Sequence, residues 1–324
     1  MFTIHLMSSG IDVWIPGLIL LGGFVGVISG LFGVGGGFLL TPCLVILFKL
    51  RYPMAVGSDL TQIFIVCSYA AFRHSRNRNV DMRLGVLMGI GAVTGTCVGK
   101  HFMDSLGNMG TFVLNGRTLD INTNVLHCLF ITLLVIVGVS VWRESRKPSE
   151  SEEVSTGLAR MLRGLHLPPQ ISFPRSDIRS MSMWLPLFLS FLVGILTGLL
   201  GVGGGFVNFP LLVYVLGVPT LVAIGTSAFQ ILFASGFGAF AYFRSGQVEL
   251  AVVGCLLAGS LLGSHFGVHL AQRLSGRNLR RYFSLVVALG ALMIIGEMVH
   301  KILIADPTEI ADSTVIEAPA TPLE

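Results

Sequence analysis

A glycine-rich run occurs twice in this sequence, and each copy interrupts an apolar stretch. The first copy reads GLFGVGGGF at residues 30–38, and the second reads GLLGVGGGF at residues 198–206, an offset of 168 residues. A proline follows each copy at the same distance, at Pro42 and at Pro210. Glycine in a helix interior costs about 1 kcal/mol relative to alanine, and in lipid every freed backbone group must find a partner within the protein. Matching breaks in two apolar segments are typical of transporter binding sites.

The composition predicts an all-α polytopic membrane protein. Of the 324 residues, 53% are hydrophobic and only 12% are charged, whereas about a quarter of a soluble domain is charged. The first apolar run lacks the basic n-region of a signal peptide, so we expect it to be retained. We expect the lipid bilayer as a partner and no nucleic acid. The ten apolar segments are 13–32, 38–48, 55–72, 84–102, 123–142, 184–200, 206–218, 221–243, 248–270 and 282–303.

Basic residues fall on alternate links between these segments. Fifteen of the 21 Lys and Arg residues lie in the links 73–83, 143–180 and 271–281, which the positive-inside rule assigns to the cytoplasm. The other links and both termini are then external, and the two halves of the chain have opposite orientations. The sequence thus predicts two inverted-topology repeats, each with a Gly-rich broken or re-entrant helix hairpin plus three transmembrane helices. The predicted parts are a first membrane repeat at 1–142, a cytoplasmic linker at 143–183, a second membrane repeat at 184–303 and an acidic C-terminal tail at 304–324.

The two halves also match beyond the glycine runs, at the same offset. Residues 57–62 (GSDLTQ) correspond to 225–230 (GTSAFQ), and 79–81 (NVD) correspond to 247–249 (QVE). A ladder of glycines spaced four apart makes one smooth helix face for close packing, either within the protomer or between the protomers of a homodimer. The two ladders are Gly91, Gly95 and Gly99, and Gly259, Gly263 and Gly267.

The glycine run fits no nucleotide-binding motif. Phe38 and Phe206 stand where a dinucleotide fingerprint needs its third glycine, and no Gly-Lys-Ser/Thr follows either copy. In a membrane, a glycine turn exposes free N–H groups, and the helix after it adds the positive end of its dipole, so the two can hold an anion. The alternative is that the glycines only permit a tight turn between packed helices. The candidate substrate-binding glycines are Gly33, Gly35, Gly36, Gly37, Gly201, Gly203, Gly204 and Gly205.

Polar side chains lie near the start of a later apolar segment in each half, 55–72 and 221–243. Ser58 and Gln62 in the first half correspond to Thr226 and Gln230 in the second, and their hydroxyl and amide groups can donate hydrogen bonds to an anion. The alternative for the two hydroxyl residues is N-capping. Capping does not explain the glutamines, which lie one turn deeper, so we expect at least one of them to face the substrate.

Two further polar residues occur in one half only. Asp59 is the only acidic residue near either motif, and its counterpart Ser227 is neutral. An intramembrane carboxylate is a candidate for proton coupling, and the alternative is a helix cap at the interface. Asn208, directly after the second run, has Leu40 as its counterpart, so it could orient a ligand from one side only.

The sequence has no pattern typical of an enzyme or a metal site. The five cysteines show no CxxC or other metal-ligand spacing. No carboxylate pair, Ser-His-Asp set or His/Cys cluster stands out. We therefore expect no enzymatic activity, no catalytic residue, no metal site and no cofactor.

The paired glycine motif, with a proline and a Gly-Ser or Gly-Thr helix start after each copy, resembles the TauE/SafE family over residues 13–303. This family is also described as the sulfite exporter or toluene-sulfonate permease group. The resemblance implies a permease of the bacterial inner membrane that moves sulfite or organosulfur anions, with proton or charge coupling. It extends to the motif residues Gly33, Gly35, Gly36, Gly37, Pro42, Gly201, Gly203, Gly204, Gly205 and Pro210.

The sequence therefore predicts a secondary transporter of a small anion, with sulfite or an organosulfonate as the leading substrate class, that works by alternating access. Protons are a second candidate partner. The alternatives are an anion channel and a non-transporting membrane scaffold or assembly factor.

Overall fold

The structure is a computed structural model that describes residues 3–6, 11–106, 111–114, 117–145 and 168–303. Each of the ten apolar segments predicted from the sequence coincides with a helix of this described part, with α8 running on into the π-helix η2. Residues 146–167 of the predicted linker and the predicted tail 304–324 lie outside the described residues. The helices are α1 (Ile15–Phe32), α2 (Gly37–Ile46), α3 (Tyr52–Arg76), α4 (Met82–Leu106), α5 (Ile121–Ser145), α7 (Trp184–Leu200), α8 (Gly205–Pro210), η2 (Leu211–Val215), α9 (Thr220–Arg244), α10 (Leu250–Arg273) and α11 (Gly276–Leu303).

Six of the described helices are long and apolar enough to cross a membrane. These six are Ile15–Phe32, Tyr52–Arg76, Met82–Met103, Thr220–Arg244, Leu250–Arg273 and Gly276–Gly296. The chain is thus a multi-pass, mostly helical membrane protein, as its composition predicts.

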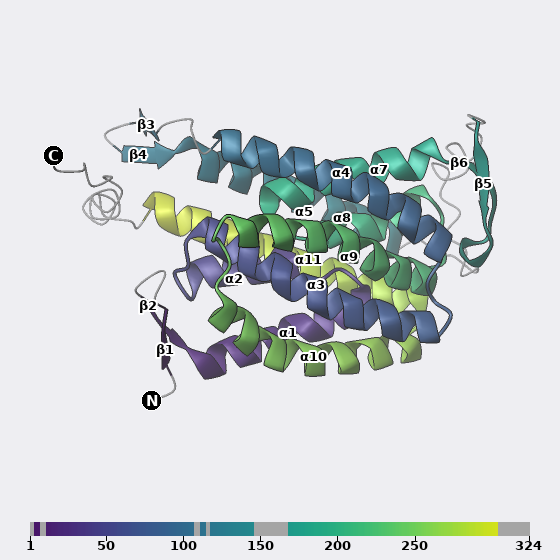
Figure 1. Ribbon diagram of the computed structural model, residues 1–324, viewed down its shortest axis with the longest axis horizontal. Helices are drawn as coiled ribbons and strands as arrows, with labels where there is room; N and C mark the ends of the chain where they lie inside the picture. Colours follow the sequence, from purple (N-terminus) through teal and green to yellow (C-terminus); the bar gives the residue numbers. More distant parts are fainter. Residues whose placement is uncertain (1–2, 7–10, 107–110, 115–116, 146–167, 304–324) are drawn as a thin grey trace.

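The helices run along the long axis of one bundle (Figure 1). Three short antiparallel hairpins, which the sequence analysis did not predict, stand at its two ends. At one end lie β1 (Thr3–Leu6) with β2 (Ile11–Trp14), and β3 (Thr111–Leu114) with β4 (Arg117–Asp120). At the other end β5 (Gln170–Phe173) pairs with β6 (Ile178–Ser182) around the short 3-10 helix η1 (Pro174–Ser176).

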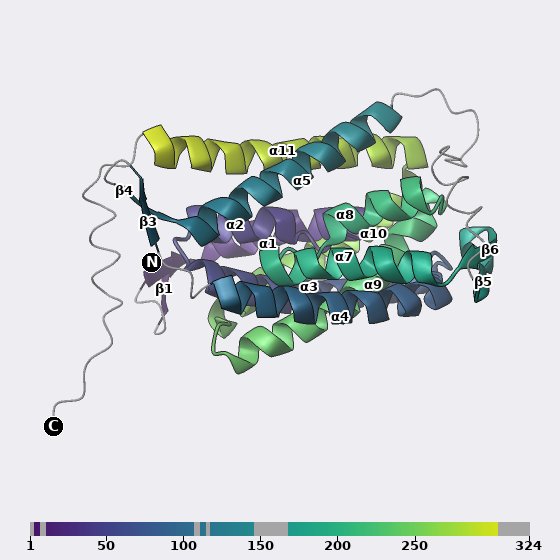
Figure 2. The ribbon, with the colours of Figure 1, turned by 90° about the horizontal axis from the view of Figure 1, so that it is seen from above.

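Two helix pairs fold back on themselves inside the bundle. The chain enters α1 and leaves α2 at the end that carries β1–β4, and it enters α7 and leaves η2 at the end that carries β5 and β6 (Figures 1 and 2). The glycine runs form the two turns, so the hairpin α1–α2 and the hairpin α7–α8 reach into the bundle from opposite ends.

The glycine ladders join the two halves of the chain backbone to backbone. A Cβ atom at Gly263 of α10 would collide with the carbonyl oxygen of Gly23 in α1, and one at Gly95 of α4 would collide with that of Phe191 in α7. The first helix of each half is therefore packed on the fourth helix of the other half. The ladders act within the protomer, so a homodimer stays a prediction that they do not support. The other ladder glycines that meet the same two partner helices are Gly91, Gly99, Gly259 and Gly267.

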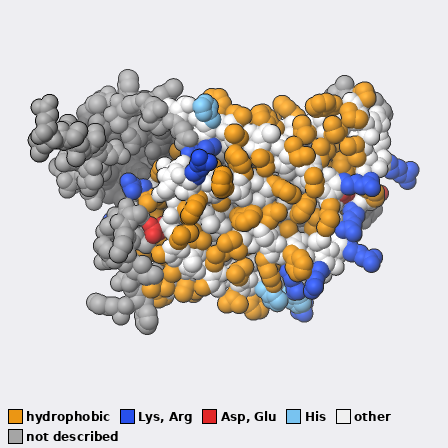
Figure 3. Space-filling view, in the orientation of Figure 1, with side chains coloured by type: hydrophobic (Ala, Val, Ile, Leu, Met, Phe, Trp, Pro, Cys, Tyr) orange, Lys and Arg blue, Asp and Glu red, His pale blue; other side chains and the backbone are white. Residues whose placement is uncertain are grey.

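Charged side chains concentrate at the ends of the bundle, and apolar ones cover its middle (Figure 3). Lys and Arg side chains gather at the end that carries β5 and β6, where the α3–α4 turn, the end of α10 and the start of α11 also lie. These elements belong to the links that the positive-inside rule assigns to the cytoplasm. The arrangement therefore agrees with the orientation predicted from the charge pattern.

A methyl group at Gly263 tests the backbone contact, and Gly254 on the same helix is the matched control because nothing lies within 4 Å of a Cβ built there. We expect Gly263→Ala to lower the free energy of unfolding by about 1–3 kcal/mol through overpacking. Gly254→Ala should leave it unchanged or raise it by up to about 1 kcal/mol through helix propensity. Unfolding of both variants in mixed detergent micelles measures the difference, and equal stability would contradict the proposed close packing.

Candidate functional site

The two glycine turns have the same backbone conformation. α1 ends at Gly33 and α7 ends at Gly201, and both residues adopt a left-handed conformation with φ near 64° and 68°. Two more glycines in each turn also have positive φ, which side chains with a Cβ rarely adopt. These are Gly35, Gly36, Gly203 and Gly204, with φ of 80°, 82°, 69° and 65°. Glycine is thus required in both turns by the backbone conformation itself.

The two turns touch each other in the centre of the bundle. A Cβ atom built on Gly37 would lie 2.9 Å from the carbonyl oxygen of Val202, and one on Gly205 would collide with the backbone of Val34. The ring centroids of Phe38 and Phe206, at the starts of α2 and α8, are 5.8 Å apart. The structure therefore brings all eight predicted glycines into one buried cluster.

Several backbone N–H groups in each turn have no hydrogen-bond partner among the described residues. Gly33 and Gly201 donate to the carbonyl oxygens of Ser29 and Thr197, at 2.8 and 2.9 Å, which closes the preceding helix. The backbone N–H groups of residues 34–38 and 202–206 donate no hydrogen bond to another described residue. A buried N–H group needs a partner, so the cluster can accept an anion or ordered water without any charged side chain.

A polar side chain on α3 or α9 bonds to the helix after each turn. Thr41 of α2 donates its hydroxyl to Oδ2 of Asp59 on α3. In the other half, Asn208 of α8 donates from Nδ2 to the hydroxyl oxygen of Ser227 on α9 at 3.0 Å. Asp59 and Ser227 are repeat-related positions, and both pairs are fully buried. Oδ2 of Asp59 would also lie 2.9 Å from a Cβ on Gly37, so the carboxylate adjoins the first turn.

Gln62 and Gln230 are the buried amides that stand out. Their side chains are 0% and 1% exposed, and neither amide nitrogen nor amide oxygen has a hydrogen-bond partner among the described residues. Gln62 lies three residues after Asp59 and Gln230 three after Ser227, a spacing that puts each pair on one helix face. A buried amide without partners is costly, so both positions suit a site that a polar ligand or water completes.

Ser58 and Thr226 have a different role in the structure. The hydroxyl oxygen of Ser58 accepts from the backbone N–H of Glu249 at 2.9 Å, and that of Thr226 accepts from the N–H of Asp81 at 3.0 Å. Glu249 and Asp81 precede α10 and α4, so each hydroxyl fixes the start of a helix in the other half. The alternative of capping their own helices is wrong, because α3 begins at Tyr52 and α9 at Thr220.

Sequence reasoning overlooked Thr41. Its only sequence signal is a hydroxyl directly before Pro42, the proline that follows the glycine run. A small cavity adjoins Thr41, and its lining includes Val45, near the end of α2, and Tyr52, the first residue of α3. No group of three or more His, Cys, Asp or Glu that could hold a metal ion occurs among the described residues.

Comparison with known proteins gives a consistent set of relatives. A family profile described as Sulfite exporter TauE/SafE matches residues 18–294. The chain is 22% identical over 287 residues to a probable membrane transporter protein, YunE, of Bacillus subtilis, an alignment that covers 86% of this chain and 97% of the relative. It is 26% identical over 280 residues to a probable membrane transporter protein of Xylella fastidiosa, covering 85% and 92%. No solved structure matches.

The cross-half hydrogen bonds of Ser58 and Thr226 predict a loss of stability when their acceptor oxygens are removed. We expect Thr226→Val and Ser58→Ala each to cost about 1–3 kcal/mol of unfolding free energy, because a buried N–H group is left unpaired. Ser235→Ala is the control, since that hydroxyl only bonds the carbonyl oxygen of Ile231 in its own helix. Unfolding measurements on purified protein check this, and a control as unstable as the two variants would contradict it.

Proposed function

The chain belongs to the TauE/SafE family, and from this premise we propose that it is a secondary transporter of a small anion, with sulfite or an organosulfonate as the substrate class. Family membership and the names of the relatives support the coarser statement, a membrane transporter. The proposed substrate class rests on the chemistry of the groups around the two glycine turns.

One observation carries the proposal: the two glycine turns meet inside the bundle against α3 and α9, and each of these helices carries a buried glutamine, Gln62 or Gln230, without a partner among the described residues. Open backbone N–H groups from both turns and the amides of Gln62 and Gln230 are neutral donors that come from both halves of the chain. Asn208 adds an amide NH2 group from the second half, which donates one hydrogen bond to Ser227 and has a second hydrogen to offer. A sulfite or sulfonate group presents three oxygens to such donors.

Among the described residues, no Lys or Arg side chain bonds the side chains of Gln62, Gln230 or Asp59. Such neutral donors favour a transporter over a tight binding protein. Neutral donors hold an anion less tightly than a buried guanidinium does, because charge-assisted hydrogen bonds are the stronger ones. Weaker binding allows release on the far side of the membrane.

We infer that the two halves form inverted repeats and that each glycine hairpin is re-entrant. The hairpins enter from opposite ends of the bundle (Figure 2), and repeat-related residues make matching contacts, such as Ser58 with Glu249 and Thr226 with Asp81. Alternating access then follows the general pattern of inverted-repeat transporters, in which one body rocks against another around a central site. The close pairs α1–α10 and α4–α7 each move as a unit, so the rocking bodies draw helices from both halves.

Asp59 is the proposed proton-coupling residue. It is a fully buried carboxylate on the same helix as Gln62, and its Oδ1 atom lacks a partner among the described residues. A carboxylate beside an anion site repels the anion unless a proton neutralises it. Binding of the anion and of the proton to this site is therefore coupled.

Two alternatives make different predictions in the same liposome assay. An anion channel gives flux that does not saturate with anion concentration and does not respond to a proton gradient. A membrane scaffold or assembly factor gives no flux, and no stabilisation by anions, whereas a binding protein at 100 times its Kd gains about 2.7 kcal/mol.

Replacement of the two glutamines by methionine tests the substrate site. We expect Gln62→Met and Gln230→Met to lower sulfite or sulfonate flux at subsaturating concentration about 10- to 100-fold, the factor for losing one hydrogen bond to a charged group. Gln272→Met, at an exposed position of α10, is the matched control and should transport normally. Normal flux in both buried variants, with intact folding by size exclusion, would overturn the proposed site.

Replacement of Asp59 by asparagine tests the coupling. Asp59→Asn keeps an oxygen for the Thr41 hydroxyl but carries no titrating group, so anion flux should persist and lose its response to an imposed pH gradient. Asp177→Asn, at an exposed position after η1, should keep the wild-type response. A pH response that survives in Asp59→Asn would exclude this residue as the coupling group.

A further inference from the structure

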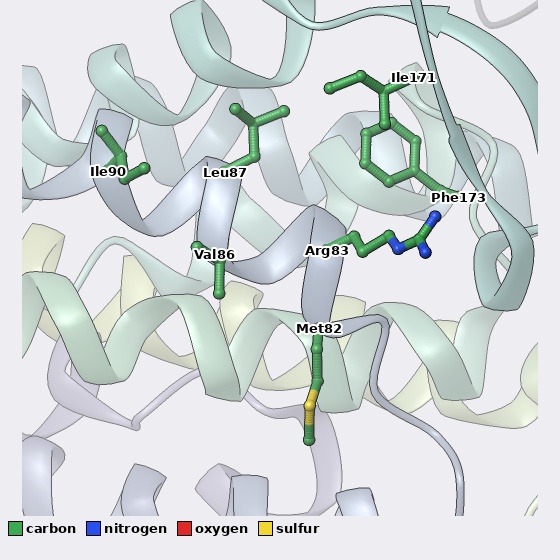
Figure 4. A pocket seen from close by; sticks show the side chains of 7 residues that line it. All are labelled: Met82, Arg83, Val86, Leu87, Ile90, Ile171 and Phe173. Atoms are coloured by element: carbon green, nitrogen blue, oxygen red, sulfur yellow. The ribbon is translucent and has the colours of Figure 1, made fainter.

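A groove at the basic end of the bundle lies between α4 and strand β5. It has a volume of about 640 Å³ and opens to the surface of the molecule. Figure 4 shows Arg83 and Phe173 at one end of it and Ile90 at the other. The residues that line it are Met82, Arg83, Val86, Leu87, Ile90, Ile171 and Phe173.

Hydrogen bonds fix the two walls of this groove relative to each other. Asp81, directly before α4, accepts at Oδ2 from both the backbone N–H and the hydroxyl of Ser176, at 3.2 and 2.9 Å. Arg175 donates to the carbonyl oxygen of Val80 at 2.9 Å. The β5–β6 hairpin is thus attached to the start of α4, so the groove is preformed.

The lining combines one cation with an apolar wall. Arg83 is the charged residue of the lining, and it forms no hydrogen bond or ion pair with another described residue. Val86 and Ile90 follow it along α4 and are 45% and 56% exposed, so the apolar wall continues onto the outer surface of the bundle. A cation followed by an apolar track matches a phospholipid, whose headgroup carries the negative charge and whose chain is hydrocarbon.

The depth of the groove in the membrane fits the same ligand. It lies at the end of the bundle where Lys and Arg gather (Figure 3), which is the end assigned to the cytoplasm. The inner leaflet is rich in anionic lipids, and each Lys or Arg near its surface attracts them by about 1 kcal/mol. Arg83 at the first turn of α4 is then level with the headgroups, and Ile90 lies two turns toward the middle of the bilayer.

We propose that this groove is a binding site for an anionic phospholipid, with the headgroup phosphate on Arg83 and one acyl chain along Val86, Leu87 and Ile90. The β5–β6 hairpin closes the outer side of the site, with Ile171 and Phe173 against the start of the chain. The site is separate from the glycine turns and does not depend on the proposed transport function.

Native mass spectrometry of the purified full chain tests the site with two lipids of equal acyl chains, phosphatidylglycerol and phosphatidylcholine. We expect the wild-type protein to retain phosphatidylglycerol about fivefold more than phosphatidylcholine, the factor expected for one Lys or Arg near an anionic surface. Arg83→Gln should abolish this preference and Arg83→Lys should keep it. Arg179→Gln, at an exposed position of the neighbouring strand β6, is the matched control and should keep it too.

A second variant separates the acyl-chain contact from the charge. Val86→Trp fills the groove and should lower the retention of both lipids at this site while Arg83 is still present. Equal retention of the two lipids by the wild type, or unchanged phosphatidylglycerol retention in both Arg83→Gln and Val86→Trp, would overturn the proposal. A dimer signal in place of bound lipid, lost in Val86→Trp, would assign the groove to a second copy of the chain and overturn it as well.

Discussion

The structure depends on the contact between the two glycine turns at the centre of the bundle. A turn of free backbone cannot face lipid, because its N–H and C=O groups would lack partners there. Each turn is covered by the other: Gly37 lies against the backbone of Val202, and Gly205 lies against that of Val34. Contact between the two halves therefore contributes to shielding both breaks from lipid.

Close contacts between the two halves also occur at the helix ends beside the turns. Gly33 and Gly201, which end α1 and α7, lie against Ile224 and Val56 of the opposite half. These contacts are repeat-related, since Val56 and Ile224 are 168 residues apart. A cluster that admits no Cβ atoms is stiff, so the polar groups around it are held at fixed positions rather than on mobile loops. Such preorganisation is what a selective site for a small anion needs.

The sequence predicted the helices and two matching glycine turns, because helices follow from local composition and the turns from a near-identical repeat. It did not predict that Thr41 bonds Asp59, or that Ser58 bonds the backbone before α10, 191 residues away. Those contacts depend on which helices become neighbours in the fold. In the sequence, a hydroxyl residue near a helix start is the same whether it caps its own helix or bonds the start of another. The β5–β6 hairpin was missed for a related reason: its short strands lie in a polar link, and they are fixed by Asp81 and Val80 of a distant turn.

Hydrogen bonding distinguishes the structural polar residues from the candidate site residues, which the internal repeat alone does not do. Ser58 and Thr226 are buried, repeat-related and hydrogen-bonded across the halves, which is sufficient to explain them as structural. Gln62 and Gln230 are equally buried and equally repeat-related, yet their amides have no partner among the described residues. Folding gains nothing from two such groups in place of leucine, so their burial supports the proposed site, where a ligand or ordered water would complete them. Asp59 makes the proposed site asymmetric, because its counterpart Ser227 cannot carry a charge, and Asn208 does so as well, because its counterpart is Leu40. In the proposed transporter, a site that faces the two sides of the membrane in turn would need donors from both halves, whereas a single coupled proton would need only one carboxylate.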